Sequence, residues 1–118
     1  MSISILLAED HKIVREGTRQ LLEQSPDMNV VGEAADGAGA LRDAARLHPD
    51  LVLLDIQLPD LDGFLVADRL AAASTPPAVV LISSRDADAY GAALDTAAAR
   101  GFLPKRLLSG AALADLMR

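Results

Sequence analysis

Five segments rich in apolar residues recur along the chain, and a polar or charged residue follows each one within two positions. They cover residues 3–8, 30–34, 51–54, 78–82 and 101–103. The run at 51–54 has no polar alternation, and this pattern is typical of a strand that is buried on both faces. It leads directly into Asp55, and Pro59 and the Asp62-Gly63 turn signal predict that the strand ends soon after this acid.

Helical periodicity fills the intervals between these strands. The spacing predicts helices over residues 11–24, 38–47, 64–71 and 86–100, and a last helix that Ser109 caps. The first of these helices has one stripe of apolar and small residues: Ile13, Val14, Gly17, Thr18, Leu21 and Leu22. In the fourth, the apolar positions are Tyr90, Ala93, Leu94 and Ala97.

Alternation of strands and helices over 118 residues predicts an α/β protein. We expect a single (βα)₅ domain over residues 1–118, with a doubly wound parallel sheet and helices on both faces. For five strands, the order 2-1-3-4-5 of known doubly wound proteins is expected, and it places strands 1 and 3 side by side.

Composition excludes several classes of function. A net charge of −6 and an aromatic content of 3% argue against nucleic-acid binding by this domain. No apolar run has the length of a membrane span, no signal peptide precedes the first strand, and we expect a cytoplasmic protein. The absence of cysteine excludes disulfides and thiolate metal sites, and His11 and His48 are interpreted as structural because neither lies near a second candidate ligand.

Acids gather where the predicted strands 1 and 3 end. Glu9 and Asp10 follow the first strand and Asp55 ends the third, so these carboxylates should share one edge of the sheet. Close carboxylates repel one another, and either protonation of one of them or a bound hard cation such as Mg²⁺ relieves that repulsion. Ser83 after strand 4 and Lys105 after strand 5 would add a hydroxyl and a positive charge. These groups together are suited to holding a phosphoryl group beside an attacking carboxylate.

Each of these residues also has an ordinary structural interpretation. Glu9 and Asp10 could cap the first helix, and we expect them to have both roles. Ser83 could be a turn residue, Lys105 a solvated lysine and Phe102 a core residue. The hypothesis of a phosphoryl site therefore depends on four strand ends supplying suitable residues together.

The motifs match a known family along nearly the whole chain. Residues 5–11 read ILLAEDH, residues 49–63 read PDLVLLDIQLPDLDG, and residues 101–105 read GFLPK, with Ser83 between them. In this combination and spacing, the chain resembles the receiver domain of bacterial two-component response regulators, which has a flavodoxin-like fold. VREG at 14–17 and VGEA at 31–34 are most similar to the NarL/FixJ class.

The resemblance implies a role for each residue of the site. Asp55 would be the phosphoacceptor, and Lys105 would pair with phosphoryl oxygens. Asp10, Asp55 and the backbone carbonyl of Gln57 would bind Mg²⁺, with Glu9 acting directly or through water. The resemblance implies no turnover of an external substrate, so the chain is not expected to be an enzyme.

The resemblance also implies a switch and its partners. Ser83 would be drawn toward the phosphoryl group, and Phe102 would rotate into the vacated space, which reshapes the face of helix 4, strand 5 and helix 5. The phosphoryl group would come from a sensor histidine kinase or a small phosphodonor, and the output would be a further domain or a partner protein. No effector domain is present in these residues, and a homodimer is possible.

Some positions depart from the family pattern, and two other functions stay open. Arg106 stands where many receivers have a proline, commonly after a cis bond, while Gln57 and Arg85 occupy positions that influence the lifetime of the phosphoryl group. One alternative is a pseudo-receiver, an interaction module that is never phosphorylated. The other is a Mg²⁺-dependent phosphohydrolase, for which Asp60 and Asp62 are the nearby candidate acids.

Overall fold

Five parallel strands form one sheet in the order β2-β1-β3-β4-β5, as predicted. The computed structural model describes residues 2–118. The strands are β1 (Ile3–Ala8), β2 (Met28–Ala34), β3 (Leu51–Asp55), β4 (Ala78–Ser83) and β5 (Gly101–Pro104). The helices are α1 (Lys12–Glu23), α2 (Gly37–Leu47), α3 (Gly63–Ala71), α4 (Ala92–Asp95) and α5 (Gly110–Leu116), with 3₁₀ turns η1 (Ala87–Ala89) and η2 (Lys105–Leu107).

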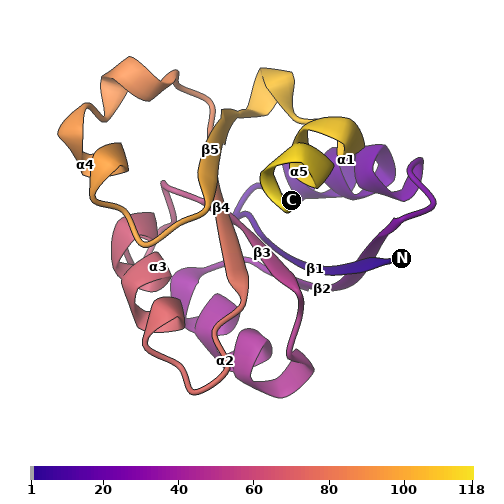
Figure 1. Ribbon diagram of the computed structural model, residues 1–118, viewed down its shortest axis with the longest axis horizontal. Helices are drawn as coiled ribbons and strands as arrows, with labels where there is room; N and C mark the ends of the chain where they lie inside the picture. Colours follow the sequence, from indigo (N-terminus) through magenta and orange to yellow (C-terminus); the bar gives the residue numbers. More distant parts are fainter. Residues whose placement is uncertain (1) are drawn as a thin grey trace.

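Helices cover both faces of the sheet and divide the core into two clusters. Helices α2 and α3 lie on one face, and α1 and α5 lie on the other (Figure 1). Successive residues of a strand point to opposite faces, so in β3 Val52 and Leu54 pack under α2 and α3, while Leu51 and Leu53 pack toward α5. This explains why β3 has no polar alternation: both of its faces are buried.

Capping groups define the ends of several helices. The Asp36 carboxylate accepts a hydrogen bond from the Gly39 backbone N–H at 2.7 Å at the start of α2, and α2 ends at His48, which has a left-handed backbone (φ 48°). The Ser109 hydroxyl accepts from the Ala112 N–H at 3.0 Å, so the predicted cap of α5 is confirmed.

The helix predicted over residues 86–100 is wrong. Only the turn η1 and the four-residue α4 form there, separated by Gly91 at φ 54°. A left-handed residue cannot continue a right-handed helix, so the alanine-rich composition does not yield one continuous helix. Tyr90, Leu94 and Ala97 nevertheless pack against the core, so part of the predicted apolar spacing is retained without the helix.

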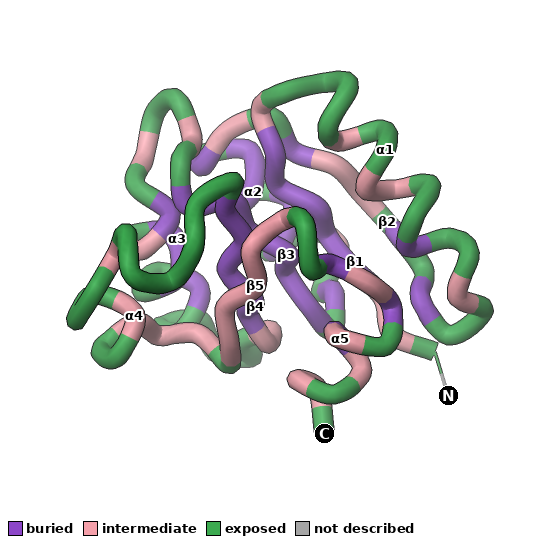
Figure 2. Tube along the Cα trace, turned by 90° about the horizontal axis from the view of Figure 1, so that it is seen from above, coloured by how far each residue is buried: buried purple, intermediate pink, exposed green. Residues whose placement is uncertain are grey.

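The apolar stripe of α1 is largely exposed, contrary to its amphipathic pattern. Leu22 is the one fully buried residue of α1, while Ile13 is 84% exposed and Leu21 is 36% exposed. Most of α1 is coloured as exposed or intermediate in Figure 2. The helix instead turns two arginines toward β2, where Arg15 and Arg19 both pair with Glu33. These ion pairs accompany the observed rotation of α1 about its axis, and hydrophobic periodicity gives no information about them.

The bend after β5 is made without a cis bond. Every described peptide bond is trans, including the one before Arg106, and Pro104 at φ −60° leads into the turn η2. Arg106 pairs with Asp86 on the surface, which links this turn to the segment after β4. Within residues 2–118, no helix is both long enough and apolar enough to span a bilayer.

Candidate functional site

The carboxyl ends of β1, β3, β4 and β5 meet at one edge of the sheet. Asp55 is the last residue of β3, and Ser83 is the last residue of β4. Glu9 follows β1 and Lys105 follows β5. Glu9 and Ser83 are fully buried and Asp55 is 4% exposed, so three polar side chains lie inside the protein at this edge. Buried polar groups need hydrogen-bond or ion-pair partners, and the partners of these three side chains form the rest of the site.

Asp55 is held at both of its carboxylate oxygens. Oδ1 accepts a hydrogen bond from the Gln57 backbone N–H at 2.9 Å, and Oδ2 lies 2.9 Å from Lys105 Nζ. Lys105 Nζ also donates to Glu9 Oε1, so the ammonium bridges two buried carboxylates. The lysine that the sequence placed at this edge therefore points into the site.

The environment of Lys105 favours its charged form. Partial burial by itself would lower the pKa of this lysine, but the hydrogen bonds to Glu9 and Asp55 and their negative charges raise it above the usual value. Lys105 is thus a fixed positive charge at physiological pH.

Three potential metal ligands cluster beside the Lys105 bridge. One atom each from Glu9, Asp10 and His11 lies within 4.8 Å of the others. Asp10 Oδ1 is buried and accepts no hydrogen bond within the described residues. A buried carboxylate oxygen that accepts no hydrogen bond, next to a second carboxylate, matches the oxygen ligands that Mg²⁺ prefers, so the residues present fit this ion. Asp55 is not a member of this cluster, and its Oδ2 is engaged by Lys105.

The structure corrects two predictions about the residues that follow β1. His11, interpreted above as remote from other ligands, has Nδ1 3.2 Å from Asp10 Oδ1. Neither acid is the N-cap of α1: that residue is His11, which makes no side-chain cap. Glu9 Oε2 accepts a hydrogen bond from the His11 N–H at 3.2 Å, and the Glu9 carbonyl accepts one from Arg15 Nη1 at 2.8 Å. Glu9 is thereby fixed before the helix begins.

The Ser83 hydroxyl contacts a residue that the sequence did not indicate. Its Oγ accepts a hydrogen bond from the Arg85 N–H at 3.0 Å and is hydrogen bonded to the Tyr90 hydroxyl. The Tyr90 ring lies edge-to-face between Phe64 and Phe102, with both centroid distances at 5.9 Å. Phe102, the predicted switch residue, is half-buried and packs on the core cluster under α2 and α3.

The loop after β3 is built around close backbone contacts and two caps. A Cβ at Gly63 would lie 2.6 Å from Ile56 Cα and 2.8 Å from the Asp55 carbonyl oxygen, so this position requires glycine. Asp60 accepts hydrogen bonds from the Gly37 and Ala38 N–H groups at the start of α2, at 2.7 and 3.0 Å. Asp62 accepts from the Phe64 N–H at 2.7 Å and caps α3. The carboxylates of Asp60 and Asp62 thus both accept hydrogen bonds from backbone N–H groups at the start of a helix.

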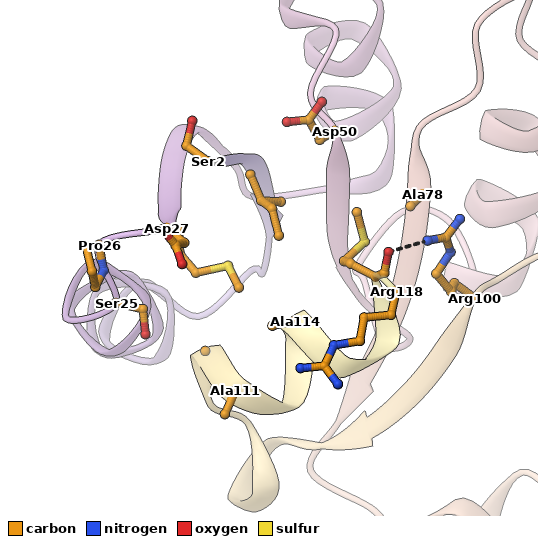
Figure 3. Close-up of a pocket in the computed structure, with 14 residues that line it drawn as sticks. Ser2, Ser25, Pro26, Asp27, Asp50, Ala78, Arg100, Ala111, Ala114 and Arg118 are labelled. Carbon is orange, nitrogen blue, oxygen red and sulfur yellow. Dashed lines mark hydrogen bonds between the residues drawn. The ribbon is translucent and has the colours of Figure 1, made fainter.

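A cavity of about 800 Å³ lies at the opposite edge of the sheet. It is lined by the first residues of β1, β2 and β4 and by one side of α5, and Arg100 donates to the Met117 carbonyl at its rim (Figure 3). The amino-terminal ends of the strands form this edge, so the cavity is separate from the carboxylate site.

Tyr90 and Arg15 are the residues of this region that the sequence interpretation missed. Tyr90 was assigned to a helix face, and its contact with Ser83 crosses a turn that has no local sequence signal. Arg15 lies outside the apolar stripe predicted for the first helix and was given no role, although it binds the Glu9 carbonyl.

Comparison with known proteins agrees with this geometry. The model of the response regulator receiver domain matches residues 5–116, and the chain therefore belongs to the receiver domain family of two-component response regulators. Its relatives place it with receivers of the NarL class.

Several relatives support this placement. The nitrate/nitrite response regulator protein NarL of Escherichia coli is 40% identical over 80 residues, which are 68% of this chain and 37% of the relative. A protein-glutamate methylesterase/protein-glutamine glutaminase of Alkalilimnicola ehrlichii is 36% identical over 108 residues, covering 90% of this chain and 27% of that enzyme. The chain thus spans less than half the length of these curated relatives.

The fold is also that of solved receivers. The structure of the signal receiver domain assigned to the response regulator NarL of Mycobacterium tuberculosis is 37% identical. It superposes with a TM-score of 0.87 and covers 98% of this chain and 96% of that one. The flavodoxin-like receiver fold is therefore shared over nearly all of both chains.

Proposed function

We propose that the chain is a phosphorylation-dependent switch of a two-component system, in which Asp55 accepts a phosphoryl group. The observation that carries this proposal is the buried Asp55 carboxylate, held by Gln57 N–H and by Lys105 Nζ at 2.9 Å each. The donor is a phosphohistidine of a sensor histidine kinase, or a small molecule such as acetyl phosphate.

The transfer forms one bond and breaks one. A carboxylate oxygen of Asp55 attacks phosphorus, the bond between phosphorus and the donor atom breaks, and the donor leaves with the bonding electron pair. Lys105 offsets the negative charge that gathers on the phosphoryl oxygens. Since Lys105 already contacts Asp55 in the structure, this charge is in position before the donor arrives.

Asp10, Asp55, Glu9 and the backbone carbonyl of Gln57 are the proposed ligands of Mg²⁺. Asp10 Oδ1, which is buried and accepts no hydrogen bond within residues 2–118, supports this assignment. When bound, the ion supplies positive charge that screens the repulsion between the carboxylates and the phosphoryl group.

The output passes through Ser83 and Phe102. Ser83 ends β4 beside the strand of Asp55, since Ile82 and Asp55 are paired in register. In this proposal the Ser83 hydroxyl moves toward the phosphoryl group, Phe102 repacks, and the face of the β4–β5 segment, β5 and α5 changes. A further domain or a partner protein then responds to that face.

Two observations weigh against the alternatives. A phosphohydrolase needs a second acid or base that activates water, and the nearby acids Asp60 and Asp62 are used as helix caps. A pseudo-receiver would be supported by loss of a site residue, whereas Glu9, Asp10, Asp55 and Lys105 are all present.

The proposal is tested by intact mass after incubation with Mg²⁺ and acetyl phosphate. We expect a gain of one phosphoryl group for the unchanged chain and none for Asp55→Asn. EDTA should abolish the gain because it removes the ion. Asp62→Asn is the matched control: it lies in the same loop, asparagine caps helices as well as aspartate does, and the gain should persist.

Other outcomes would point elsewhere. No mass gain with acetyl phosphate or with phosphorylated kinase would support the pseudo-receiver. Continuous release of phosphate from a generic phosphate ester, without a lasting mass gain, would support the phosphohydrolase.

A further inference from the structure

The Ser83 hydroxyl is already engaged by two partners. It is fully buried at the end of β4, where Oγ accepts a hydrogen bond from the Arg85 N–H at 3.0 Å. The Tyr90 hydroxyl is the second partner. A serine hydroxyl has one hydrogen to donate and two lone pairs that accept, so the direction of the second bond decides what Ser83 can still do.

The chemistry of the two hydroxyls favours Tyr90 as the donor. A phenol oxygen shares electron density with its ring, which makes the phenol a stronger donor and a weaker acceptor than an aliphatic alcohol. With Tyr90 donating, both lone pairs of Ser83 Oγ are occupied, by Tyr90 and by Arg85. The hydrogen of Ser83 is then the one hydrogen-bonding function left unused.

The Tyr90 ring is fixed from two sides. It packs edge-to-face on Phe64 at an interplanar angle of 65° and on Phe102 at 62°. Edge-to-face contacts are directional, so the ring holds the position of its hydroxyl. Tyr90 therefore joins Ser83, the predicted switch residue Phe102 and the segment after β4 in one contact chain.

We propose that Tyr90 is a positioning residue of the Asp55 site: it donates to Ser83 Oγ, leaves the Ser83 hydrogen free for a phosphoryl oxygen on Asp55, and transmits the displacement of Ser83 to Phe102. This inference rests on the proposed function. Tyr90 touches neither Asp55 nor Lys105 through a hydrogen bond within the described residues, so it acts through Ser83.

Phosphorylation of Asp55 then moves a connected group of side chains. The phosphoryl oxygen accepts the Ser83 hydrogen, Ser83 shifts toward it, and the Tyr90 hydroxyl follows its acceptor. Because the Tyr90 ring contacts Phe102, the ring of Phe102 has to repack. The break at Gly91 and the short helix α4 leave this segment with little regular hydrogen bonding to resist the movement.

A double-mutant cycle on the rate of phosphorylation by acetyl phosphate tests the positioning role. Tyr90→Phe keeps the ring and removes only the hydroxyl, and the rate should fall about fivefold, the effect of one hydrogen bond. In Ser83→Ala the phosphorylation rate should fall by at least the same factor. The double variant should be phosphorylated at the same rate as Ser83→Ala, since Tyr90 acts only through Ser83. A role in packing alone would change the stability of Tyr90→Phe and leave this rate unchanged.

Thr18→Val is the matched control for loss of a hydroxyl. The Thr18 hydroxyl donates to the Val14 carbonyl on the surface of α1, and its removal should leave the rate unchanged. Circular dichroism of each variant establishes that the chain is folded during the assay.

Intrinsic fluorescence tests the transmission. Tyr90 is the single tyrosine of the chain, which has no tryptophan, so tyrosine emission reports on this one residue. We expect the emission to change at the same rate as the mass gain. In Ser83→Ala the mass gain should continue, more slowly, while the emission change is lost. Asp55→Asn should show neither change.

The outcomes separate this inference from the proposed function. If the unchanged chain takes up no phosphoryl group, the proposed function fails, and this inference fails with it. If the chain is phosphorylated and Tyr90→Phe reacts as fast as the unchanged chain, only the positioning role is overturned. Emission that stays constant while the mass increases overturns the transmission.

Discussion

At the scale of single residues, the position of Asp55 depends on a glycine eight residues later. Gly63 lies where its backbone meets Ile56 Cα and the Asp55 carbonyl, and its N–H donates to the Ile56 carbonyl at 2.9 Å. No side chain can be accommodated there without moving the backbone next to Asp55. The glycine therefore lets the loop fold back against the strand end that supplies Asp55, the proposed phosphoacceptor.

Gly63→Ala should lower the free energy of unfolding by about 2 kcal/mol, because a Cβ against backbone atoms forces the loop to shift. The matched variant is Gly17→Ala, for which the added Cβ meets nothing within 4 Å. Gly17 lies inside α1, where alanine is the better helix former, and this variant should gain about 0.5–1 kcal/mol. Urea unfolding of both variants measures the contrast, and equal midpoints would contradict the close contact at Gly63.

At the scale of elements, an acid from the loop after β3 holds the start of α2. Both Asp60 carboxylate oxygens accept hydrogen bonds from backbone N–H groups of that helix. These bonds, from Gly37 first and then Ala38, lower the pKa of Asp60 below its usual value. One carboxylate thereby connects the loop beside Asp55 to a helix that lies 22 and 23 residues earlier in the chain.

Asp60→Asn should lower the Tm at neutral pH, because asparagine has one acceptor oxygen where aspartate has two. The folded-state pKa of Asp60 is depressed, so its stabilisation is present above the unfolded-state pKa near 3.8 and is lost as the pH falls through the folded-state value. The difference in Tm between Asp60→Asn and the unchanged chain should therefore disappear in acid. Asp68→Asn, an exposed acid of α3 that caps no helix, should follow the profile of the unchanged chain, and a constant difference for Asp60→Asn would contradict the cap.

The element that sequence periodicity described least well is the connection between β4 and β5. Alanine has a high intrinsic helix propensity, which favoured one helix over residues 86–100. The structure instead has the short turn η1 and the four-residue helix α4, separated by Gly91 with its positive φ. Tyr90 binds Ser83 and Asp86 pairs with Arg106 in this segment. Contacts with distant residues outweigh a local preference of a few tenths of a kcal/mol per residue.

At the scale of the whole molecule, the sheet brings together charged side chains that lie far apart in the chain. Lys105 bridges Glu9 and Asp55, which lie 96 and 50 residues away from it in the chain. Only the folded chain has this arrangement, so a cation that binds the carboxylates binds the folded state preferentially. Binding should therefore be coupled to stability.

Mg²⁺ at ten times its Kd should stabilise the folded chain by about 1.4 kcal/mol, which raises the Tm by about 5 °C for a domain of this size. EDTA should reverse the increase. Asp10→Asn should abolish this increase in Tm, because Asp10 supplies the buried carboxylate oxygen that accepts no hydrogen bond within residues 2–118. Asp27 lies by the cavity at the other edge of the sheet, so Asp27→Asn should show the same Mg²⁺-dependent increase in Tm as the unchanged chain. An equal increase in Asp10→Asn, measured by thermal unfolding, would contradict the proposed ion site.

The five strands, the parallel sheet and the residue types that meet at its carboxyl edge were all predictable from the amino-acid sequence. These features follow from local hydrophobic runs and from the geometry of right-handed crossovers, which leave few alternatives. Tertiary structure alone decided the rotation of α1, the broken segment after β4 and the partnership of Ser83 with Tyr90. These depend on ion pairs, ring contacts and hydrogen bonds between side chains whose distances are set only when the whole chain packs, and no local pattern encodes such distances.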